Sequence, residues 1–310
     1  MTDLRPDHND QAETAEAEAR PRSARPLRTT QIAGGRTVGY YEYGDPTGTP
    51  VIALHGTPGS GAGFSWADAA ARQRSVRLLA PDRPGVGLSS PAELRPVIDY
   101  PDDLAAFADA VGIDQFALFG YSGGGPFACA AAYRLGDRLT RAGVIAGAGQ
   151  IGVWATVDQS EPTDRMFMRL SLRFRPLGSV LLQASSTVAR RLPRLAIASA
   201  KRELAPADRR AAARFGDDRQ LLDMFTEAFL HGTRGVLDDY ASISVGWGFA
   251  VEQIRRPVYI WHGDADTTVP IAHSEALAAR LREPRLTVWP GEGHLAIIEH
   301  IGEVLDALTR

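Results

Sequence analysis

Several features that would point to a special cellular setting are scarce in this sequence. Cys129 is its only cysteine, which makes an internal disulfide impossible and leaves no set of thiolates for a metal site. No apolar run approaches the roughly 20 residues that a membrane-spanning helix needs. The 34 basic and 37 acidic residues give a net charge of -3, so the basic footprint of a nucleic-acid-binding protein is missing. A cytoplasmic protein with no membrane or nucleic-acid partner is therefore the default expectation.

The first 29 residues have few large apolar side chains and consist mainly of Ala, Glu, Asp, Arg and Pro. Such a segment cannot bury enough surface to offset the entropy that is lost on ordering. It also lacks the apolar run of a signal peptide, and its early acidic residues, among them Asp3, Asp7 and Asp10, disagree with a transit peptide. We predict that residues 1–29 form a disordered N-terminal tail.

Short apolar runs alternate with helical patterns after this tail. The runs are continuous, which is typical of strands that helices cover on both faces of a sheet. They lie at residues 51–56, 76–82, 115–120 and 140–148, after a hairpin or edge-strand pattern that begins at Arg36. Helical patterns lie between them, at residues 64–73, 99–113 and 124–137. The alternation predicts an α/β fold with a mostly parallel central sheet and helices on both faces.

The alternation stops at about residue 150 and resumes only after residue 252. The intervening segment has helical apolar spacing, many arginines and no convincing strand pattern. A strand pattern at residues 255–264 then restarts the core, and a helix, a further strand and a last helix follow it. We predict an α/β core of residues 30–150 and 251–310, interrupted by a helical insert at residues 151–250.

Residues 120–124, Gly-Tyr-Ser-Gly-Gly, form a G-x-S-x-G sequence directly between a predicted strand and a predicted helix. In that position a nucleophilic serine is held on a sharp, strained turn, and the flanking glycines permit the close approach of strand and helix. The turn would expose the Ser122 hydroxyl at the carboxyl edge of the sheet, where open α/β folds bind ligands. Ser122 is therefore the candidate nucleophile.

The loop after the first buried strand, residues 55–60, is a candidate to stabilise negative charge. A tetrahedral intermediate needs two backbone N–H groups aimed at its oxygen. We predict that Gly123, which follows the serine, donates one of them and that Thr57 donates the other, because Pro58 has no N–H group. We expect His55, in the same loop, to brace the loop and not to act as a base.

His294 is the candidate general base among seven histidines. It lies in a glycine-bracketed loop after the last predicted strand, from which an imidazole can reach Ser122 at the carboxyl edge of the sheet. The acid that orients it is expected in the loop after the preceding strand. Asp264 and Asp266 are both candidates there.

Five stretches together resemble the α/β-hydrolase superfamily over most of the predicted core. They occur in family order with ordinary spacing: HGTPGS, PDRPGVGLS, GYSGGG, HGDADTTVP and GEGH. The order Ser122, acid, His294 is also that of the family. The resemblance implies that Asp266 is the acid of a catalytic triad, that Asp264 is its neighbour, and that the helical insert is a cap.

The expected reaction is hydrolysis of a carboxylic ester or lactone through an acyl-enzyme on Ser122, with no metal or organic cofactor. Apolar side chains of the insert favour a small to medium apolar substrate. Acyl transfer to another acceptor, perhydrolysis and C–C bond cleavage could use the same residues, and a non-catalytic ligand-binding receptor is a further alternative. The only partner implied is a small-molecule substrate, and the sequence leaves the oligomeric state open.

Overall fold

The computed structural model describes residues 27–155, 160–213 and 218–310. Most of the tail predicted over residues 1–29 lies outside these ranges. Its last three residues are described, and the last two of them belong to strand β1 (Arg28–Ile32), which pairs antiparallel with the following strand. The predicted boundary is therefore slightly too late. The reason is that the polar sequence of β1, RTTQI, has no apolar alternation to reveal an edge strand.

Eight strands form one sheet in the order β1-β2-β4-β3-β5-β6-β7-β8. The β1-β2 and β2-β4 pairs are antiparallel, and all other neighbouring pairs are parallel. The remaining strands are β2 (Arg36–Gly44), β3 (Thr49–Leu54), β4 (Val76–Pro81), β5 (Phe116–Tyr121), β6 (Leu139–Ile145), β7 (Val258–Gly263) and β8 (Pro284–Trp289). The predicted α/β fold with a mostly parallel sheet is confirmed.

The chain changes direction across the sheet at β3. It moves from β3 to β4 on one side, crosses to β5 on the other side, and continues outward through β6, β7 and β8. The loops that leave the carboxyl ends of β3 and β5 therefore diverge, and such a switch point is where open α/β sheets form a ligand-binding crevice. Ser122 directly follows β5 and Thr57 lies shortly after β3, so both residues lie at this crevice.

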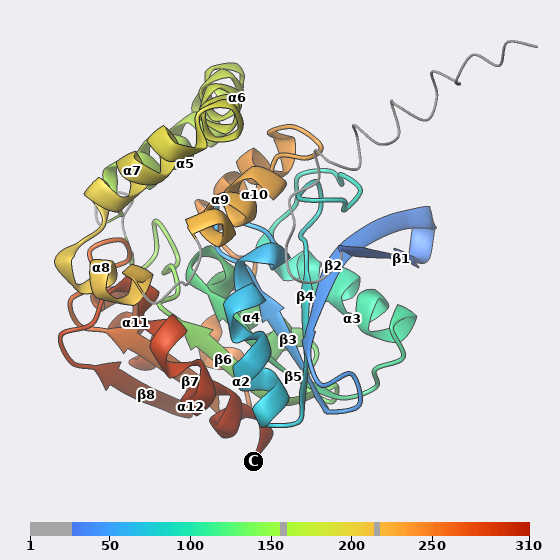
Figure 1. Ribbon diagram of the computed structural model, residues 1–310. Coiled ribbons are helices and arrows are strands. Elements are labelled where there is room, and N and C mark those ends of the chain that lie inside the picture. The colour runs from blue at the N-terminus through green and yellow to red at the C-terminus, as the bar shows by residue number, and fades with distance from the viewer. Residues whose placement is uncertain (1–26, 156–159, 214–217) are drawn as a thin grey trace, which may run out of the picture.

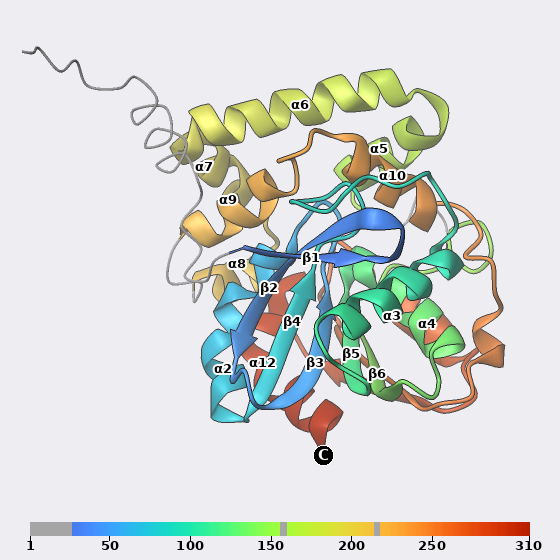
Figure 2. The same ribbon diagram turned by 90° about the vertical axis from the view of Figure 1, so that its right-hand side faces the viewer.

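Helices cover both faces of the sheet, as Figures 1 and 2 show. Each layer buries its own apolar core against the sheet, one containing Phe107 and Phe127 and the other containing Phe64 and Ile301. The helices are α3 (Tyr100–Ala110), α4 (Gly125–Arg134) and α11 (Ala272–Ala278) on one face, and α2 (Asp68–Gln73) and α12 (Ile297–Thr309) on the other.

Between β6 and β7 the described residues form six α-helices, which sit together at one end of the sheet (Figures 1 and 2). In the described part of this segment the only strand-like feature is a single bridge between Ile151 and Ala155. The helices are α5 (Pro162–Arg173), α6 (Arg175–Arg191), α7 (Pro193–Glu203), α8 (Pro206–Ala213), α9 (Asp218–Glu227) and α10 (Arg234–Ile243). We call these six helices the insert helices. The long helix α6 is the outermost element in both views.

The apolar side chains of the insert do not all have the same role. Phe167, Met168 and Phe229 are buried, so they contribute to the core beneath the insert helices. Phe174 and Met166 are instead exposed, by 62% and 39%. The expectation of an apolar substrate assumed that apolar side chains of the insert line a pocket, and the exposure of Phe174 does not fit that role.

Candidate active site

Ser122 lies on a strained turn between β5 and α4. Its φ is 54°, in the left-handed region that side chains other than glycine rarely adopt. Such a conformation costs on the order of 1–3 kcal/mol and persists only where the surrounding structure enforces it. The turn η4 (Ser122–Gly124) leads directly into α4, so the hydroxyl lies at the carboxyl end of β5 and at the amino end of a helix.

Two glycines of the G-x-S-x-G sequence are required by close approach of the backbone. A Cβ atom on Gly120 would lie 2.2 Å from the carbonyl oxygen of Gly124, and one on Gly124 would lie 2.3 Å from that of Leu54. Both contacts are with backbone, which cannot move aside as a flexible side chain could. The strand, the turn and the helix can therefore pack in this way only without side chains at these positions.

The side chains of Ser122, His294 and Asp266 form a continuous chain of hydrogen bonds. Nε2 of His294 lies 3.0 Å from Oγ of Ser122, and its Nδ1 lies 2.7 Å from Oδ2 of Asp266. His294 begins the turn η7 (His294–Ala296) after β8, and Asp266 lies in the loop after β7. Both side chains are almost completely buried. The structure therefore brings together the three residues that the sequence proposed as nucleophile, base and acid.

Asp264 and Asp266 have different positions, although the sequence left both open as the acid. Oδ1 of Asp266 accepts the backbone N–H groups of Thr268 and Val269 at 2.8 and 2.9 Å, which fixes its carboxylate and leaves Oδ2 for His294. Oδ1 of Asp264 instead accepts the N–H of Gly291 at 2.6 Å. Asp264 thus ties two loops together, and it is Asp266 that contacts the histidine.

A second histidine contacts the same carboxylate. Nε2 of His262, at the end of β7, lies 3.2 Å from Oδ2 of Asp266 and 2.8 Å from the carbonyl oxygen of Val269. Its Nδ1 lies 2.6 Å from the hydroxyl of Ser274. His262 therefore holds the acid loop from behind. The sequence did not single it out among the seven histidines.

Charge and burial act in opposite directions on the histidine and the acid. Burial alone would lower the pKa of His294, but the adjacent carboxylate of Asp266, together with two further carboxylates nearby, outweighs burial, and the pKa is raised. Burial would likewise raise the pKa of Asp266, yet His294 and hydrogen bonds from both histidines hold it below its ordinary value. Asp266 therefore stays ionised and favours the protonated form of His294, as a carboxylate that stabilises an imidazolium must.

Thr57 and Gly123, predicted as the two backbone donors, are in contact beside the serine. A Cβ atom on Gly123 would lie 3.1 Å from the backbone nitrogen of Thr57. A Cβ atom on Gly56 would lie 3.2 Å from Cβ of Ser122. The two loops therefore meet at Ser122, and a Cβ atom at either glycine would force its neighbours to shift.

A buried arginine, Arg83, holds the loop that carries Thr57. Its guanidinium donates to the carbonyl oxygen of Gly56 at 3.0 Å and to Oγ1 of Thr57 at 2.9 Å, and it also bonds the carbonyl oxygen of His55. The carboxylate of Asp239, on α10, lies 2.6 Å from the same guanidinium and balances its charge. Arg83 lies in the PDRPGVGLS stretch that resembles the α/β-hydrolase superfamily, but the sequence did not single it out.

His55 belongs to this brace. Its Nδ1 lies 2.8 Å from the carbonyl oxygen of Gly56, and its Nε2 accepts the backbone N–H of Arg83 at 3.2 Å. Burial, reinforced by the charge of Arg83, holds the pKa of His55 well below its ordinary value. A neutral imidazole with both nitrogens engaged braces the loop, which is the role that the sequence suggested.

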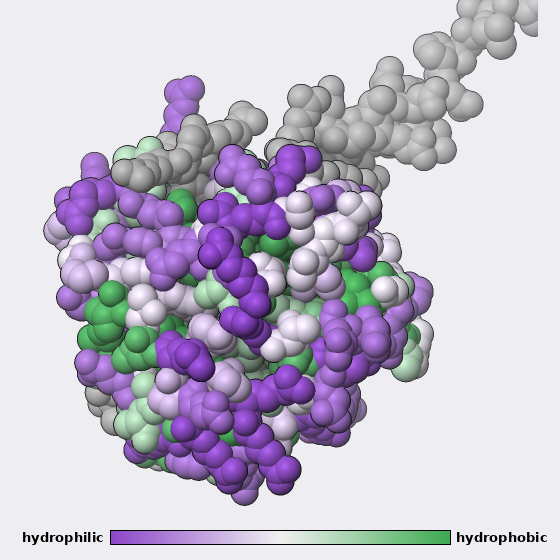
Figure 3. Space-filling view, turned by 90° about the horizontal axis from the view of Figure 1, so that it is seen from below, coloured by the Kyte–Doolittle hydropathy of each residue, from purple (hydrophilic) through white to green (hydrophobic). Residues whose placement is uncertain are grey.

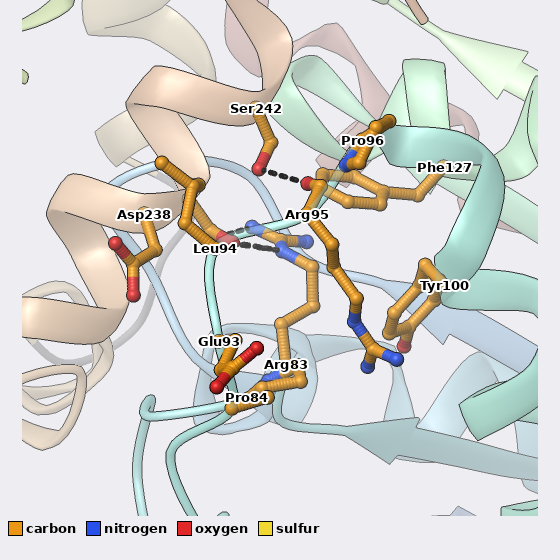
Figure 4. Close-up of a pocket in the computed structure, with 12 residues that line it drawn as sticks. Arg83, Pro84, Glu93, Leu94, Arg95, Pro96, Tyr100, Phe127, Asp238 and Ser242 are labelled. Atoms are coloured by element: carbon orange, nitrogen blue, oxygen red, sulfur yellow. Dashed lines mark hydrogen bonds and ion pairs between the residues drawn. The ribbon is translucent and has the colours of Figure 1, made fainter. Parts of the chain in front are cut away.

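Figure 4 looks into a pocket beside Arg83. The ring of Phe127 packs against the guanidinium of Arg83, with 4.7 Å from the ring centroid to Cζ. The hydroxyl of Ser242, on α10, donates to the carbonyl oxygen of Arg95 at 2.9 Å. Several polar side chains around this pocket are already paired, for example Arg83 with Asp239 and Arg95 with Asp103. The pocket therefore lies where the core meets the insert helices, and it is separate from the side of the loop on which Ser122 lies.

Two carboxylates from the insert helices approach the histidine loop. Oδ1 of Asp208, on α8, accepts the backbone N–H of Leu295 at 2.7 Å, and a Cβ atom on Gly293 would collide with the same carboxylate. Asp164, on α5, accepts the hydroxyl of Tyr240 at 2.6 Å. Burial raises the pKa of Asp208, and it raises that of Asp164 to about 6.

Both carboxylates contribute to the raised pKa of His294. Sequence reasoning missed them, as it missed Asp239, because an isolated acid in a helical pattern gives no sign of which core loop its helix will contact. Within the described residues, no group of three or more His, Cys, Asp or Glu side chains could hold a metal ion.

Comparisons with known proteins identify the fold family. The family model described as the alpha/beta hydrolase fold matches residues 49–301. A 2-hydroxymuconate semialdehyde hydrolase from Pseudomonas putida is 25% identical over 272 residues, covering 87% of this chain and 88% of that protein.

Solved structures with the same fold include a hydrolase from Pseudomonas aeruginosa PA01, with a TM-score of 0.67, 18% identity and coverage of 92% of this chain and 98% of that one. An enol-lactonase from Burkholderia xenovorans LB400 has a TM-score of 0.65, 21% identity and coverage of 92% and 100%. The family match spans most of the sequence and includes Ser122, Asp266 and His294. The chain therefore belongs to the α/β hydrolase fold family.

Proposed function

We propose that this chain is a serine hydrolase that cleaves a carboxylic ester or lactone through an acyl-enzyme on Ser122. The observation that carries the proposal is the hydrogen-bonded chain from Oγ of Ser122 to His294 at 3.0 Å and on to Asp266 at 2.7 Å. A nucleophile, a base and an orienting acid within hydrogen-bond reach are the arrangement that activates a serine hydroxyl.

In the proposed reaction His294 takes the proton of Ser122 as Oγ attacks the carbonyl carbon. The resulting imidazolium is stabilised by Asp266, and the oxyanion is held by the backbone N–H groups of Gly123 and Thr57. The C–O bond of the substrate then breaks, and the leaving alkoxide takes the proton from His294. Water, deprotonated by the same imidazole, attacks the acyl-enzyme and releases the acid and free Ser122.

The surroundings of His294 support an uncharged substrate. The ring of Tyr121 lies 5.0 Å from the imidazole, and the carboxylates of Asp164 and Asp208 lie close enough to act on its pKa. An anionic substrate would meet negative charge on the insert side of the site. We propose that the insert helices act as a cap, as their contact with the histidine loop through Asp208 supports, and that small to medium apolar esters or lactones are preferred.

C–C bond hydrolysis is a second candidate for the same residues. The relative from Pseudomonas putida is named for 2-hydroxymuconate semialdehyde, a molecule with no ester bond, so its hydrolysis must break a C–C bond. That substrate is anionic, however, and the carboxylates near His294 in this chain favour the ester or lactone reaction.

Steady-state kinetics on a graded series of p-nitrophenyl esters, a γ-lactone and a 2-hydroxymuconate-type substrate would test the proposal. We expect kcat/KM to rise over the first few acyl carbons, at about fourfold per methylene that is buried. Ser122→Ala should abolish this activity, and Ser185→Ala, on the exposed side of α6, should leave it unchanged. Turnover of the C–C substrate alone would select the second candidate, and no turnover of any substrate would contradict both.

A further inference from the structure

Exposed apolar side chains are concentrated on the outward side of α5, α6 and α7. Of the fifteen large apolar side chains that are exposed among the described residues, eight lie between Met166 and Leu195. Phe174, Val180 and Leu195 are 62%, 64% and 59% exposed. Single exposed apolar residues are ordinary, whereas a concentration of this kind marks an interaction surface. We call the exposed side chains of residues 166–202 the outer surface of the insert.

Helix α6 is apolar on two opposite sides. Leu182 and Ala189 are buried against the neighbouring insert helices. Leu177, Val180 and Val188 are exposed, and their spacing places them on the side away from Leu182. A surface helix of a globular protein normally has polar residues on that side. Because α6 is the outermost element in Figures 1 and 2, its second apolar side faces away from the protein.

Helix α7 continues this surface. None of its residues is buried, although it carries Leu195 and follows directly on Leu192, which are 59% and 53% exposed. A helix whose large apolar side chains are exposed has the amphipathic character of a helix that lies in an interface between water and an apolar phase.

The segment that carries the outer surface is also strongly basic. Residues 165–203 contain nine basic residues and one acidic residue, Glu203, which gives a charge of 9 - 1 = +8 in a chain whose net charge is -3. Arg173, Arg191 and Arg194 are exposed, and none of them forms an ion pair with a residue in the described ranges. At these three positions the positive charge beside the apolar side chains has no acidic partner among the described residues.

We propose that the outer surface of the insert binds the surface of an anionic lipid bilayer. Apolar side chains flanked by Arg and Lys suit the headgroup region, where the apolar groups enter the acyl boundary and the basic groups contact phosphates. No helix in the described ranges is both long and apolar enough to cross a membrane, so the contact is peripheral. The expectation of no membrane partner rested on the lack of such a helix, which does not bear on a surface contact.

Two other occupants fit the same surface less well. A second copy of the chain would bring one positive surface against another, and like charges repel at an apolar contact. Nucleic acid would use the arginines but would leave Leu177, Val180 and Leu195 without an apolar partner, because its contacts are mainly with phosphates. A bilayer uses both the charge and the apolar side chains. It would also hold apolar esters close to the end of the sheet where Ser122 lies.

Vesicle sedimentation tests the proposal with the full chain carrying Ser122→Ala, so that no lipid is hydrolysed. Vesicles of phosphatidylcholine with a third of phosphatidylglycerol should bind the protein in 0.1 M salt, and pure phosphatidylcholine vesicles should bind it far more weakly. Salt at 0.5 M should weaken binding to the anionic vesicles, because it screens the charges.

Arg191→Glu/Arg194→Glu should weaken binding to anionic vesicles by roughly thirtyfold or more, since each basic residue near such a surface contributes about fivefold. The control is Arg255→Glu/Arg282→Glu, which changes the net charge equally. These residues precede β7 and β8, at the opposite and mainly hydrophilic end that Figure 3 shows, and their reversal should leave binding nearly unchanged. Leu192→Ser/Leu195→Ser should weaken binding without removing its salt dependence.

Three results would overturn the proposal, provided that circular dichroism shows each variant to be folded. One is equal binding to neutral and anionic vesicles, or no binding to either. Another is equal loss from the control pair of reversals. The third is evidence that the surface binds a different partner. Binding of duplex DNA without vesicle binding would indicate nucleic acid, and a dimer that Leu192→Ser/Leu195→Ser disrupts, without vesicle binding, would indicate a second copy.

Discussion

Replacing Asp266 by asparagine tests the proposed triad at its acid, because both carboxylate oxygens of Asp266 accept hydrogen bonds. Oδ1 accepts two backbone N–H groups at 2.8 and 2.9 Å, and Oδ2 accepts Nδ1 of His294 at 2.7 Å. An amide has a single accepting oxygen. If that oxygen stays on the two backbone donors, the NH₂ group meets His294 and favours the tautomer with its proton on Nε2. That tautomer cannot take the proton of Ser122.

The expected loss follows from both effects of the change. The wrong tautomer and the missing negative charge beside the imidazolium together lower kcat by about 10⁴-fold in serine hydrolases with this chain of groups. Asp264→Asn is the matched control, because an asparagine oxygen can still accept the N–H of Gly291, which Asp264 now accepts at 2.6 Å. We expect this control to stay within a few-fold of the unmodified chain.

The assay is kcat and kcat/KM for a short p-nitrophenyl ester, with melting temperatures to show that both variants are folded. A downfield proton resonance of His294 Nδ1 should be present in the Asp264→Asn variant and absent in Asp266→Asn. Activity of Asp266→Asn above about a tenth of the original, or a larger loss from Asp264→Asn, would refute the assignment of the acid.

The contacts around the site lead to three further predictions. Asp208→Asn removes a negative charge and so lowers the pKa of His294, and the acid limb of the kcat/KM profile should therefore move to lower pH. An unchanged acid limb would contradict this. Asp208→Ala also loses the hydrogen bond to the N–H of Leu295 and should lower kcat as well. Arg83→Met leaves Asp239 buried without a partner and should cost about 3–5 kcal/mol in urea unfolding, part of which Arg83→Met/Asp239→Leu should restore; equal stability of the two variants would count against the brace. Gly124→Ala should give an unstable or inactive protein, whereas Gly246→Ala, whose Cβ meets nothing within 4 Å, should keep its melting temperature.

Local sequence patterns predicted the core well because each depends on few residues. The buried strands are short continuous apolar runs, and the turn at Ser122 needs glycines that the sequence displays. Motif order also limited the acid to two positions. The choice between Asp264 and Asp266 from the residues alone was not possible, because both follow the same strand. It depends on which carboxylate reaches His294 in three dimensions.

The contacts between core and insert could not be predicted in the same way. Asp208, Asp164 and Asp239 reach the core loops only because α8, α5 and α10 dock as they do, and helical spacing does not specify which loop a helix will contact. Strand β1 was missed for a different reason. It is an edge strand whose stability comes from pairing with β2 and not from its own apolar side chains.

Covalent labelling of the nucleophile tests the central claim most directly. The chain would be treated with a fluorophosphonate, and the adduct located by mass spectrometry of the intact protein and its peptides. One adduct is expected, on Ser122, formed more slowly after His294→Ala and absent after Ser122→Ala. An adduct on another serine, or no adduct on a folded chain, would contradict the claim that Ser122 is an activated nucleophile.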